Sequence, residues 1–313
     1  MRILITGAAG FIGSHTAAYF AEQGHDVIGL DSFSDYYDPA LKRLNQEDIE
    51  KAGVRFVEID LNDDLGSHLP GDIDYIFHFA AQPGISATTP LEDYVNNNIY
   101  ATQNFLDWAK EYSPDLKLFV NIATSSIYGK EATLPETAVP TPISYYGTTK
   151  LAAEQLVLGE HRTGKIKACS LRLYSVYGPR ERPEKLYTKL IKSIIEDTEF
   201  PLFEGSEKHS RSFTYVGDIV KGMAAVIGKE EVLGGEIVNI GSDKEYTTKE
   251  GIELIEKIIG KPAKIKRTPP RPGDQLRTTA LIDKARKLLG YEPETEFEEG
   301  LKAQVEWYKQ KFC

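Results

Sequence analysis

The stretch RILITGAAGFIG, residues 2–13, is the strongest indication of the fold in the sequence. An apolar run over residues 2–7 ends in a glycine-rich turn, and a helical pattern follows over residues 11–23. Gly7, Gly10 and Gly13 lie in this turn, where glycine lets the backbone approach a ligand closely. A helix N-terminus offers free N–H groups and the positive end of its dipole. The stretch therefore predicts a strand–turn–helix unit that binds a pyrophosphate.

The same order of elements continues along the chain. Most of the short β-prone runs are apolar throughout rather than alternating, which is typical of parallel strands buried on both faces. Helical patterns stand between them, and the series indicates an α/β fold with a doubly wound parallel sheet of the Rossmann type. The further predicted strands cover residues 26–31, 54–60, 75–80, 116–124 and 166–174, and the further predicted helices cover residues 91–112 and 146–163.

The texture of the sequence changes after about residue 175, where proline, glycine and charged residues become frequent. We expect a Rossmann domain over residues 1–175 and a smaller α/β domain over residues 176–212 and 242–313. Helices are expected in the smaller domain near 184–197, 248–260 and 283–290. Residues 213–241 hold a helical pattern and the run EIVNIG, so we expect this segment to return to the first domain.

Composition limits the classes of function. The chain has 313 residues and a net charge of −10, which argues against a nucleic-acid or anionic-membrane partner. Two cysteines are too few for a disulfide framework, and the six histidines form no metal-ligand pattern. We read no signal peptide or membrane span, and the expected location is the cytoplasm.

Acidic residues follow the second and third predicted strands. Asp31, about twenty positions after the glycines, suits the ribose hydroxyls of NAD and repels the 2′-phosphate of NADP. Asp60 is placed to accept a hydrogen bond from an adenine amino group. Ala80 and Ala81, at the end of the fourth strand, would let a cofactor lie against the backbone. The cofactor predicted from these positions is NAD.

The stretch SYYGTTKLAAE, residues 144–154, sets two tyrosines before a lysine at the start of a predicted helix. Residues four apart share a helix face, so Tyr146 lies beside Lys150 while Tyr145 points elsewhere. A neighbouring ammonium favours a phenolate and lowers the pKa of the phenol. Tyr146 is therefore the candidate base, although an isolated Y-x-x-x-K pattern also fits a surface tyrosine.

Taken together, the motifs resemble the extended short-chain dehydrogenase/reductase family, and the resemblance covers nearly the whole chain. It is carried by T-G-x-x-G-x-x-G at 6–13, D-L at 60–61, H-x-A-A at 78–81, Asn98, T-S-S-x-Y-G at 124–129, Y-x-x-x-K at 146–150 and Y-G-P-R at 177–180. Members typically act on nucleotide-sugars with tightly held NAD. Many are dimers through a four-helix bundle, which the helices near 91–112 and 146–163 would supply here.

The resemblance assigns roles by matching positions. It implies that Tyr146 is the catalytic base, that Lys150 keeps it acidic and positions the nicotinamide ribose, and that Thr124 hydrogen-bonds the reacting oxygen. The implied cofactor-binding residues are Gly7, Gly10, Phe11, Ile12, Gly13, Asp31, Asp60, Leu61, Phe79, Ala80, Ala81, Gln82, Asn98, Tyr146, Lys150 and Tyr174. The implied substrate-binding residues are Pro83, Thr124, Ser125, Ser126, Tyr146, Ser175, Arg182, Lys189, Arg211, Arg271 and Asp274.

The segment after the fifth strand bears on the reaction. Family dehydratases carry T-D-E here and the UDP-glucuronate decarboxylases carry T-S-E, whereas this chain has Thr124, Ser125 and Ser126. A serine is no proton reservoir near neutral pH, so a positioned acid for elimination is missing. The remaining outcome is 4-epimerisation, in which a 4-keto sugar turns over and takes the hydride back. A function of a different class is that of a non-catalytic sensor that binds NAD. Such proteins lose the tyrosine, lysine or threonine, whereas this chain has all three.

The sugar is expected to be acidic. The segments at 78–86 and 177–191 are most similar to those of the UDP-glucuronate 4-epimerases, which share A-A-x-P-G and R-x-R-P-[DE]. The resemblance implies that Arg182 meets the sugar carboxylate. Many relatives continue P-G-V-R where this chain has Pro83, Gly84, Ile85 and Ser86. A UDP-glucose/UDP-galactose 4-epimerase is therefore kept as the alternative.

Overall fold

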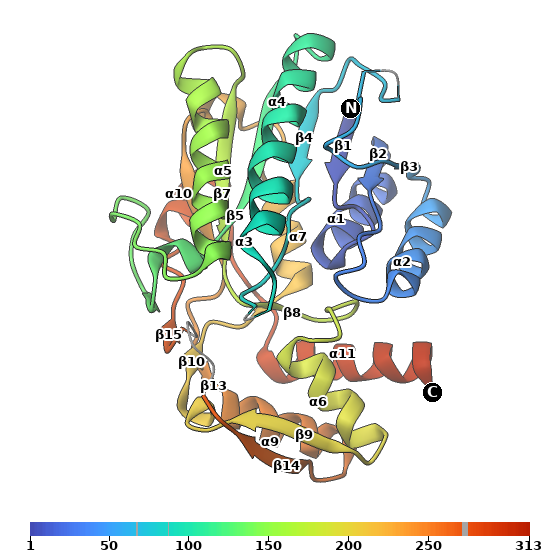
Figure 1. Cartoon of the computed structure of the whole chain (residues 1–313), viewed down its shortest axis with the longest axis vertical. Helices are drawn as coiled ribbons and strands as arrows, with labels where there is room; N and C mark the ends of the chain where they lie inside the picture. Colours follow the sequence, from blue (N-terminus) through green and yellow to red (C-terminus); the bar gives the residue numbers. More distant parts are fainter. Residues whose placement is uncertain (67, 87, 271–274) are drawn as a thin grey trace.

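The computed structural model describes residues 1–66, 68–86, 88–270 and 275–313. Its largest element is a seven-stranded parallel sheet in the order β12-β7-β5-β4-β1-β2-β3 (Figure 1). This order confirms the predicted doubly wound α/β fold. The strands are β1 (Arg2–Thr6), β2 (Asp26–Asp31), β3 (Arg55–Glu58), β4 (Tyr75–His78), β5 (Leu118–Thr124), β7 (Ala168–Leu173) and β12 (Ile237–Ile240).

Helices cover both faces of this sheet, and each face has its own apolar core. One core includes residues of α1 (Phe11–Glu22), α2 (Pro39–Lys51), α7 (Val216–Ala224) and α10 (Asp283–Leu289). The other includes residues of α4 (Ala101–Tyr112) and α5 (Tyr145–Arg162), which lie side by side in Figure 1. The sheet is therefore buried on both faces, as its apolar strands require.

A second, smaller part lies beyond one end of the sheet (Figure 1). Its aromatic core packs helices against each other and against a two-stranded parallel sheet. The elements are α6 (Leu186–Ile195), β9 (Glu199–Phe203), η3 (Ser206–Lys208), α9 (Thr248–Ile259), β14 (Lys264–Thr268) and α11 (Phe297–Phe312). Neither α2 nor α11 was among the predicted helices.

Short strands join the two parts. In a four-stranded sheet in the order β13-β10-β15-β6, the strand β6 from before residue 175 pairs with β15 from the C-terminal part of the chain. A two-stranded sheet pairs β8 with β11. The strands are β6 (Glu131–Ala132), β8 (Val176–Tyr177), β10 (Ser210–Arg211), β11 (Thr214–Tyr215), β13 (Tyr246–Thr247) and β15 (Arg277–Thr278), and α8 (Glu230–Leu233) precedes β12.

The predicted helix over residues 91–112 is not one regular helix. It consists of α3 (Leu91–Val95), a π-helical turn η1 (Asn96–Tyr100) and α4. A π turn holds an extra residue, and such turns are frequent at functional sites. Here it carries Asn98, whose side chain is buried and hydrogen-bonded to the neighbouring segments. No helix in the part of the chain that the structure describes is long and apolar enough to cross a membrane.

Candidate active site

A cavity of about 650 Å³ lies at the carboxyl ends of the main-sheet strands. Residues after β1 and β4, the neighbours between which the strand order reverses, contribute to its wall. Ligands of open α/β sheets bind at this switch point. The second part closes the cavity with residues of α6, β9 and β10. A single cavity therefore spans both parts of the molecule.

The glycine turn forms the floor of the cavity beneath the first turn of α1. Gly7 has φ +68°, and a Cβ there would lie 2.9 Å from the backbone nitrogen of Ala80. A Cβ on Gly13 would lie 2.2 Å from the carbonyl oxygen of Gly7, so the helix can pack this closely only with glycine. No described side chain caps α1 at Gly10, and its first turn holds no acidic residue. These features fit a pyrophosphate at the helix N-terminus.

Two carboxylates stand on the wall beyond the glycine turn. Asp31, at the end of β2, accepts hydrogen bonds from the N–H groups of Ala9 at 3.2 Å and Phe33 at 2.9 Å. Asp60 accepts from the backbone and side-chain nitrogens of Asn62 at 2.8 and 2.9 Å. Both carboxylates are thus fixed in orientation where they line the cavity.

The tyrosine, lysine and threonine expected to act together do meet in this cavity. Helix α5 begins after Ser144, whose hydroxyl accepts a hydrogen bond from the N–H of Gly147 at 3.1 Å. One turn later the helix presents Lys150, which is 3% exposed. Tyr146, Lys150 and Thr124 line the cavity, whereas Tyr145 is 56% exposed and lies outside its described lining.

The titration of these groups differs from expectation. Burial raises the pKa of Tyr146, and it outweighs the lowering by the hydrogen bond with Thr124 and by the charge of Arg182. Lys150 is not among the groups that lower this pKa; burial instead lowers its own pKa to about 8, against the opposing charge of Glu154. In this structure burial therefore outweighs the groups that lower the pKa of Tyr146, and the expected lowering by Lys150 is not among their effects.

Asn98 supports the site from behind the wall. Its Oδ1 accepts a hydrogen bond from the N–H of Gln82 at 2.7 Å, and its Nδ2 donates to Thr149 Oγ1 at 2.9 Å. Asn98 thereby ties the segment after β4 to α5. Among the described residues predicted to bind the cofactor, Asn98 is the one that does not line the cavity.

The predicted substrate residues gather at the end of the cavity that faces the second part. Arg182, in the linker before α6, forms an ion pair with Glu184 at 3.2 Å, and its guanidinium lies 5.7 Å from the ring centre of Tyr36. The predicted residues that line this end are Pro83, Ser125, Ser126, Ser175, Arg182, Lys189 and Arg211. The predicted contacts Arg271 and Asp274 lie outside the described residues.

The sequence analysis missed several polar residues of the wall. Lys42 comes from α2, and Lys185 stands at the start of α6. Lys185 lines the cavity with an exposed side chain, next to the charge of Arg182. Gln275 donates to the carbonyl oxygen of Gly129 at 2.9 Å. The sequence contains a signal for the helix that carries Lys42. Asp38 is followed by Pro39, and an aspartate before a proline is typical of a helix start.

Within the described residues, no group of three or more histidine, cysteine, aspartate or glutamate side chains could hold a metal ion. A glycine turn at a helix N-terminus, joined to a tyrosine–lysine–threonine group in one cavity, defines a dinucleotide-dependent enzyme. The model of the NAD dependent epimerase/dehydratase family matches residues 3–241. The chain belongs to this family, the extended short-chain dehydrogenases/reductases, and its cofactor is NAD.

Comparison with similar proteins narrows the function of the chain to that of a nucleotide-sugar epimerase or dehydratase. A Bacillus subtilis protein named as an uncharacterized UDP-glucose epimerase is 38% identical, and the match covers 97% of each chain. A UDP-glucuronate 4-epimerase of Thermodesulfobacterium geofontis is 35% identical over 98% of this chain and 96% of its own. The crystal structure of UDP-glucuronic acid 4-epimerase from Bacillus cereus with UDP-glucuronic acid and NAD is 37% identical, covers 100% of both chains and has a TM-score of 0.93.

Proposed function

We propose that this enzyme catalyses the 4-epimerisation of a UDP-sugar, converting UDP-glucuronate to UDP-galacturonate. The observation that carries the acidic sugar is the state of Arg182. Its Nη1 is buried and has no hydrogen-bond partner within the described residues, although the side chain stands on the cavity wall. Its charge lowers the pKa of Tyr146, so the two groups are near each other. A buried guanidinium nitrogen without a hydrogen-bond partner, beside the reacting centre, suits a carboxylate.

Each side chain of the site has its own role in the proposed reaction. Tyr146 takes the proton of the sugar hydroxyl, and Thr124 donates a hydrogen bond to the reacting oxygen. Lys150 would hold its positive charge toward the nicotinamide ribose of bound NAD. When bound, NAD supplies the redox chemistry that these side chains lack, accepting a hydride from the sugar carbon and returning it. The 4-keto sugar turns over in the cavity before the return, and the product differs only at that carbon.

The acidic groups of the wall support epimerisation over elimination. Within the described residues, the carboxylates that line the cavity are Asp31, Asp60 and Glu184. The first two stand at the cofactor end, and Glu184 is paired with Arg182. The family resemblance implies that Ser125 and Ser126 stand at the positions that carry acids in the dehydratases. The general acid that elimination needs is therefore missing among these groups.

The charge of the substrate end also suits an acidic nucleotide-sugar. Arg182, Lys185, Lys189 and Arg211 line this end, against the carboxylate of Glu184. A UDP-uronate carries the charges of its diphosphate and of its carboxylate, so an excess of cations is an appropriate counterpart. We assign nucleotide binding to the segments 176–212 and 242–313, the first of which supplies all four of these cations.

A neutral sugar is the second candidate. The Bacillus subtilis relative is named a UDP-glucose epimerase, and its identity is similar to that of the UDP-glucuronate 4-epimerases. The segment Pro83–Ser86 also lacks the arginine of many UDP-glucuronate enzymes. The deciding experiment incubates the protein separately with UDP-glucuronate and with UDP-glucose and resolves the products by NMR. Conversion of UDP-glucose alone would overturn the acidic-sugar assignment.

We further propose a homodimer in the cytoplasm, formed through the helices near 91–112 and 146–163. The helices α4 and α5 lie side by side at the surface (Figure 1). Large apolar side chains are exposed in and next to them, notably Tyr100 at 61% and Leu91 at 45%. Exposed apolar side chains on neighbouring helices support burial against a second copy.

A further inference from the structure

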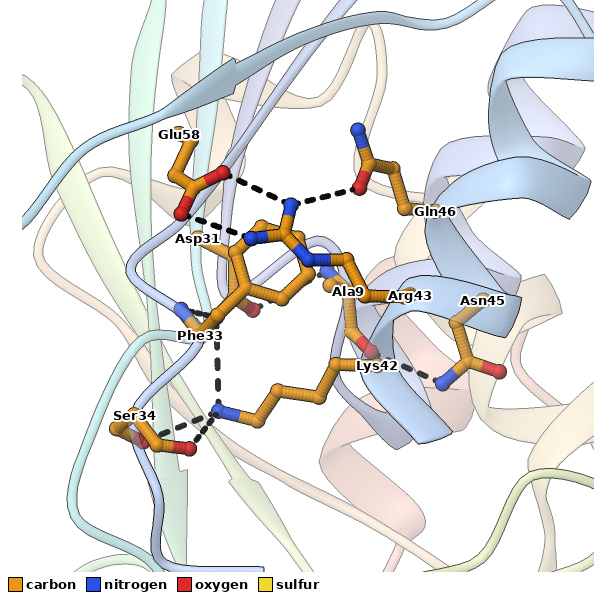
Figure 2. A network of polar contacts seen from close by, with 9 residues as sticks. All are labelled: Ala9, Asp31, Phe33, Ser34, Lys42, Arg43, Asn45, Gln46 and Glu58. Atoms are coloured by element: carbon orange, nitrogen blue, oxygen red, sulfur yellow. Dashed lines mark hydrogen bonds and ion pairs between the residues drawn. The ribbon is translucent and has the colours of Figure 1, made fainter. Parts of the chain in front are cut away.

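Two neighbouring cations of α2, Lys42 and Arg43, lie near Asp31, the carboxylate at the cofactor end of the cavity (Figure 2). Lys42 lies on the cavity wall with its side chain only 7% exposed. Its Nζ donates to the backbone oxygen of Ser34 at 3.1 Å and to its hydroxyl at 3.0 Å, and lies 3.6 Å from Asp31 Oδ1. A buried lysine is thus fixed within reach of both the carboxylate and the cavity.

Arg43 provides the contrast. Its guanidinium lies 3.5 Å from the ring centre of Phe33 and forms an ion pair with Glu58 at 2.8 Å. Its side chain is 45% exposed, and it is not among the described residues that line the cavity. Of the two adjacent cations, Lys42 is the one that faces the cofactor end.

The negative charge of Asp31 therefore has a positively charged neighbour as well as hydrogen-bond donors. Each of its oxygens accepts one backbone hydrogen bond, and Lys42 stands beside Oδ1. A carboxylate at the adenosine ribose disfavours NADP by repelling its 2′-phosphate. A lysine a few ångströms away opposes that repulsion, because a phosphate at the same place would meet a positive charge as well as a negative one.

We propose that Lys42 is a determinant of cofactor selectivity, which opposes Asp31 and becomes the ligand of a 2′-phosphate once the Asp31 charge is removed. The preference for NAD is then a balance between these two side chains. This inference rests on the assignment of Asp31 to the adenosine ribose, which is part of the proposed site. The competing explanation is that Lys42 only anchors the Ser34 segment, and this role would not distinguish the two cofactors.

The test is a double-mutant cycle in the full-length protein freed of nucleotide. Calorimetry measures the Kd of NAD and of NADP for the parent, Asp31→Asn, Lys42→Met and the double variant. Mass spectrometry identifies the nucleotide that copurifies with each. Arg43→Met is the matched control, an adjacent cation outside the cavity. If Lys42→Met does not fold, Lys42→Gln replaces it, because the amide can still donate to Ser34 without the charge.

We expect Asp31→Asn to improve NADP binding. Adding Lys42→Met to that variant should weaken NADP binding roughly tenfold to a hundredfold, as expected for the loss of a charge-assisted hydrogen bond. NAD binding should change much less, and Arg43→Met should change neither ratio. Equal weakening of both cofactors by Lys42→Met, or an equal effect of Arg43→Met, would overturn the role of Lys42. An Asp31→Asn variant with unchanged discrimination would instead refute the ribose assignment, which separates the two failures.

Discussion

At the scale of single residues, the two adjacent tyrosines of α5 differ in environment. Tyr146 faces the cavity with Thr124 and Lys150, whereas Tyr145 is largely exposed. We expect Tyr146→Phe to lower kcat by at least ~10²–10⁴-fold, the usual worth of general base catalysis. Tyr145→Phe is the matched control and should keep most of the activity. Steady-state rates with the UDP-sugar substrate check this, and equal losses would show that the assignment within YYGTTK is wrong.

Arg182 is expected to select the acidic sugar. Loss of a charge-assisted hydrogen bond costs ~1.5–3 kcal/mol. Arg182→Ala should therefore lower kcat/KM for UDP-glucuronate by roughly tenfold to a hundredfold. A neutral UDP-hexose should lose much less. Kinetics with both substrates check this, and equal loss for both would make Arg182 structural and favour the neutral sugar.

The same variant should also change the products. The 4-keto uronate is a β-keto acid, which loses CO2 when its carboxylate bond aligns with the carbonyl π system. A carboxylate held by Arg182 in another orientation resists this loss. We therefore expect Arg182→Ala to release some UDP-4-keto-pentose together with NADH, detected by NMR and by absorbance. A product mixture as clean as that of the parent enzyme would argue against this holding role.

We expect the buried charge of Lys150 to lower the free energy of unfolding, although the residue is needed for activity. Burial lowers its pKa from 10.5 to about 8, a difference worth roughly 3–4 kcal/mol at ~1.4 kcal/mol per pKa unit. Below pH 8 the lysine is charged in both the folded and unfolded states, so its burial cost is complete. As pH rises from 8 to 10.5 the unfolded state binds more protons than the folded one, and the cost disappears.

We therefore expect Lys150→Met to be inactive but more stable than the parent at pH 7, with the gain fading toward pH 10.5. Urea unfolding at several pH values measures the difference in free energy. A gain that does not change with pH would show that improved packing, rather than removal of a buried charge, stabilises the variant.

At the scale of elements, a buried ion pair joins α5 to the strands beneath it. Arg172 of β7 and Glu154 of α5 are 1% and 0% exposed, and their closest contact is 2.6 Å. Ser170 and Tyr128 complete the network with hydrogen bonds of 2.9 and 2.8 Å. Because Glu154 lies one turn after Lys150, the same network fixes the helix that carries the catalytic residues.

Removing one partner of this pair should be costly. Glu154→Gln leaves the Arg172 charge buried without a counter-ion, and we expect a loss of ~3–5 kcal/mol in the free energy of unfolding. Glu160→Gln is the control on the same helix: this residue pairs with Lys110 nearer the surface, and we expect ~0–1 kcal/mol. Urea unfolding compares the two, and similar losses would contradict a special role of the buried pair.

At the scale of the whole molecule, the proposed dimer can be tested at its exposed apolar residues. Tyr100 lies in the π turn and Val139 lies in a loop outside the proposed interface, where it is 79% exposed. Tyr100→Glu should convert the dimer to the 35.0 kDa monomer in analytical ultracentrifugation. Val139→Glu should not. A parent protein that sediments as a monomer would refute the dimer outright.

The central strands of the fold and the main residues of the site can be predicted from the amino-acid sequence. Apolar runs predict buried parallel strands because a strand covered on both faces has no solvent side. The glycine turn and the Tyr146–Lys150 spacing are local patterns, so they are readable without knowing the fold. The helices α2 and α11 were missed although local signals existed, a capping Asp38 before Pro39 in one case and apolar spacing from Phe297 in the other.

Features that depend on contacts between distant segments cannot be predicted from local patterns and become visible in the folded molecule. Glu131–Ala132 pairs with Arg277–Thr278, and α10 shares an apolar core with α1, so segments far apart in the sequence contribute to shared sheets and cores. The meeting of Lys42 with Asp31, and of Arg182 with Tyr146, likewise follows from packing. The direction of the Tyr146 pKa shift was misjudged for the same reason. Spacing along a helix shows which charges are near, whereas desolvation depends on everything that surrounds the group.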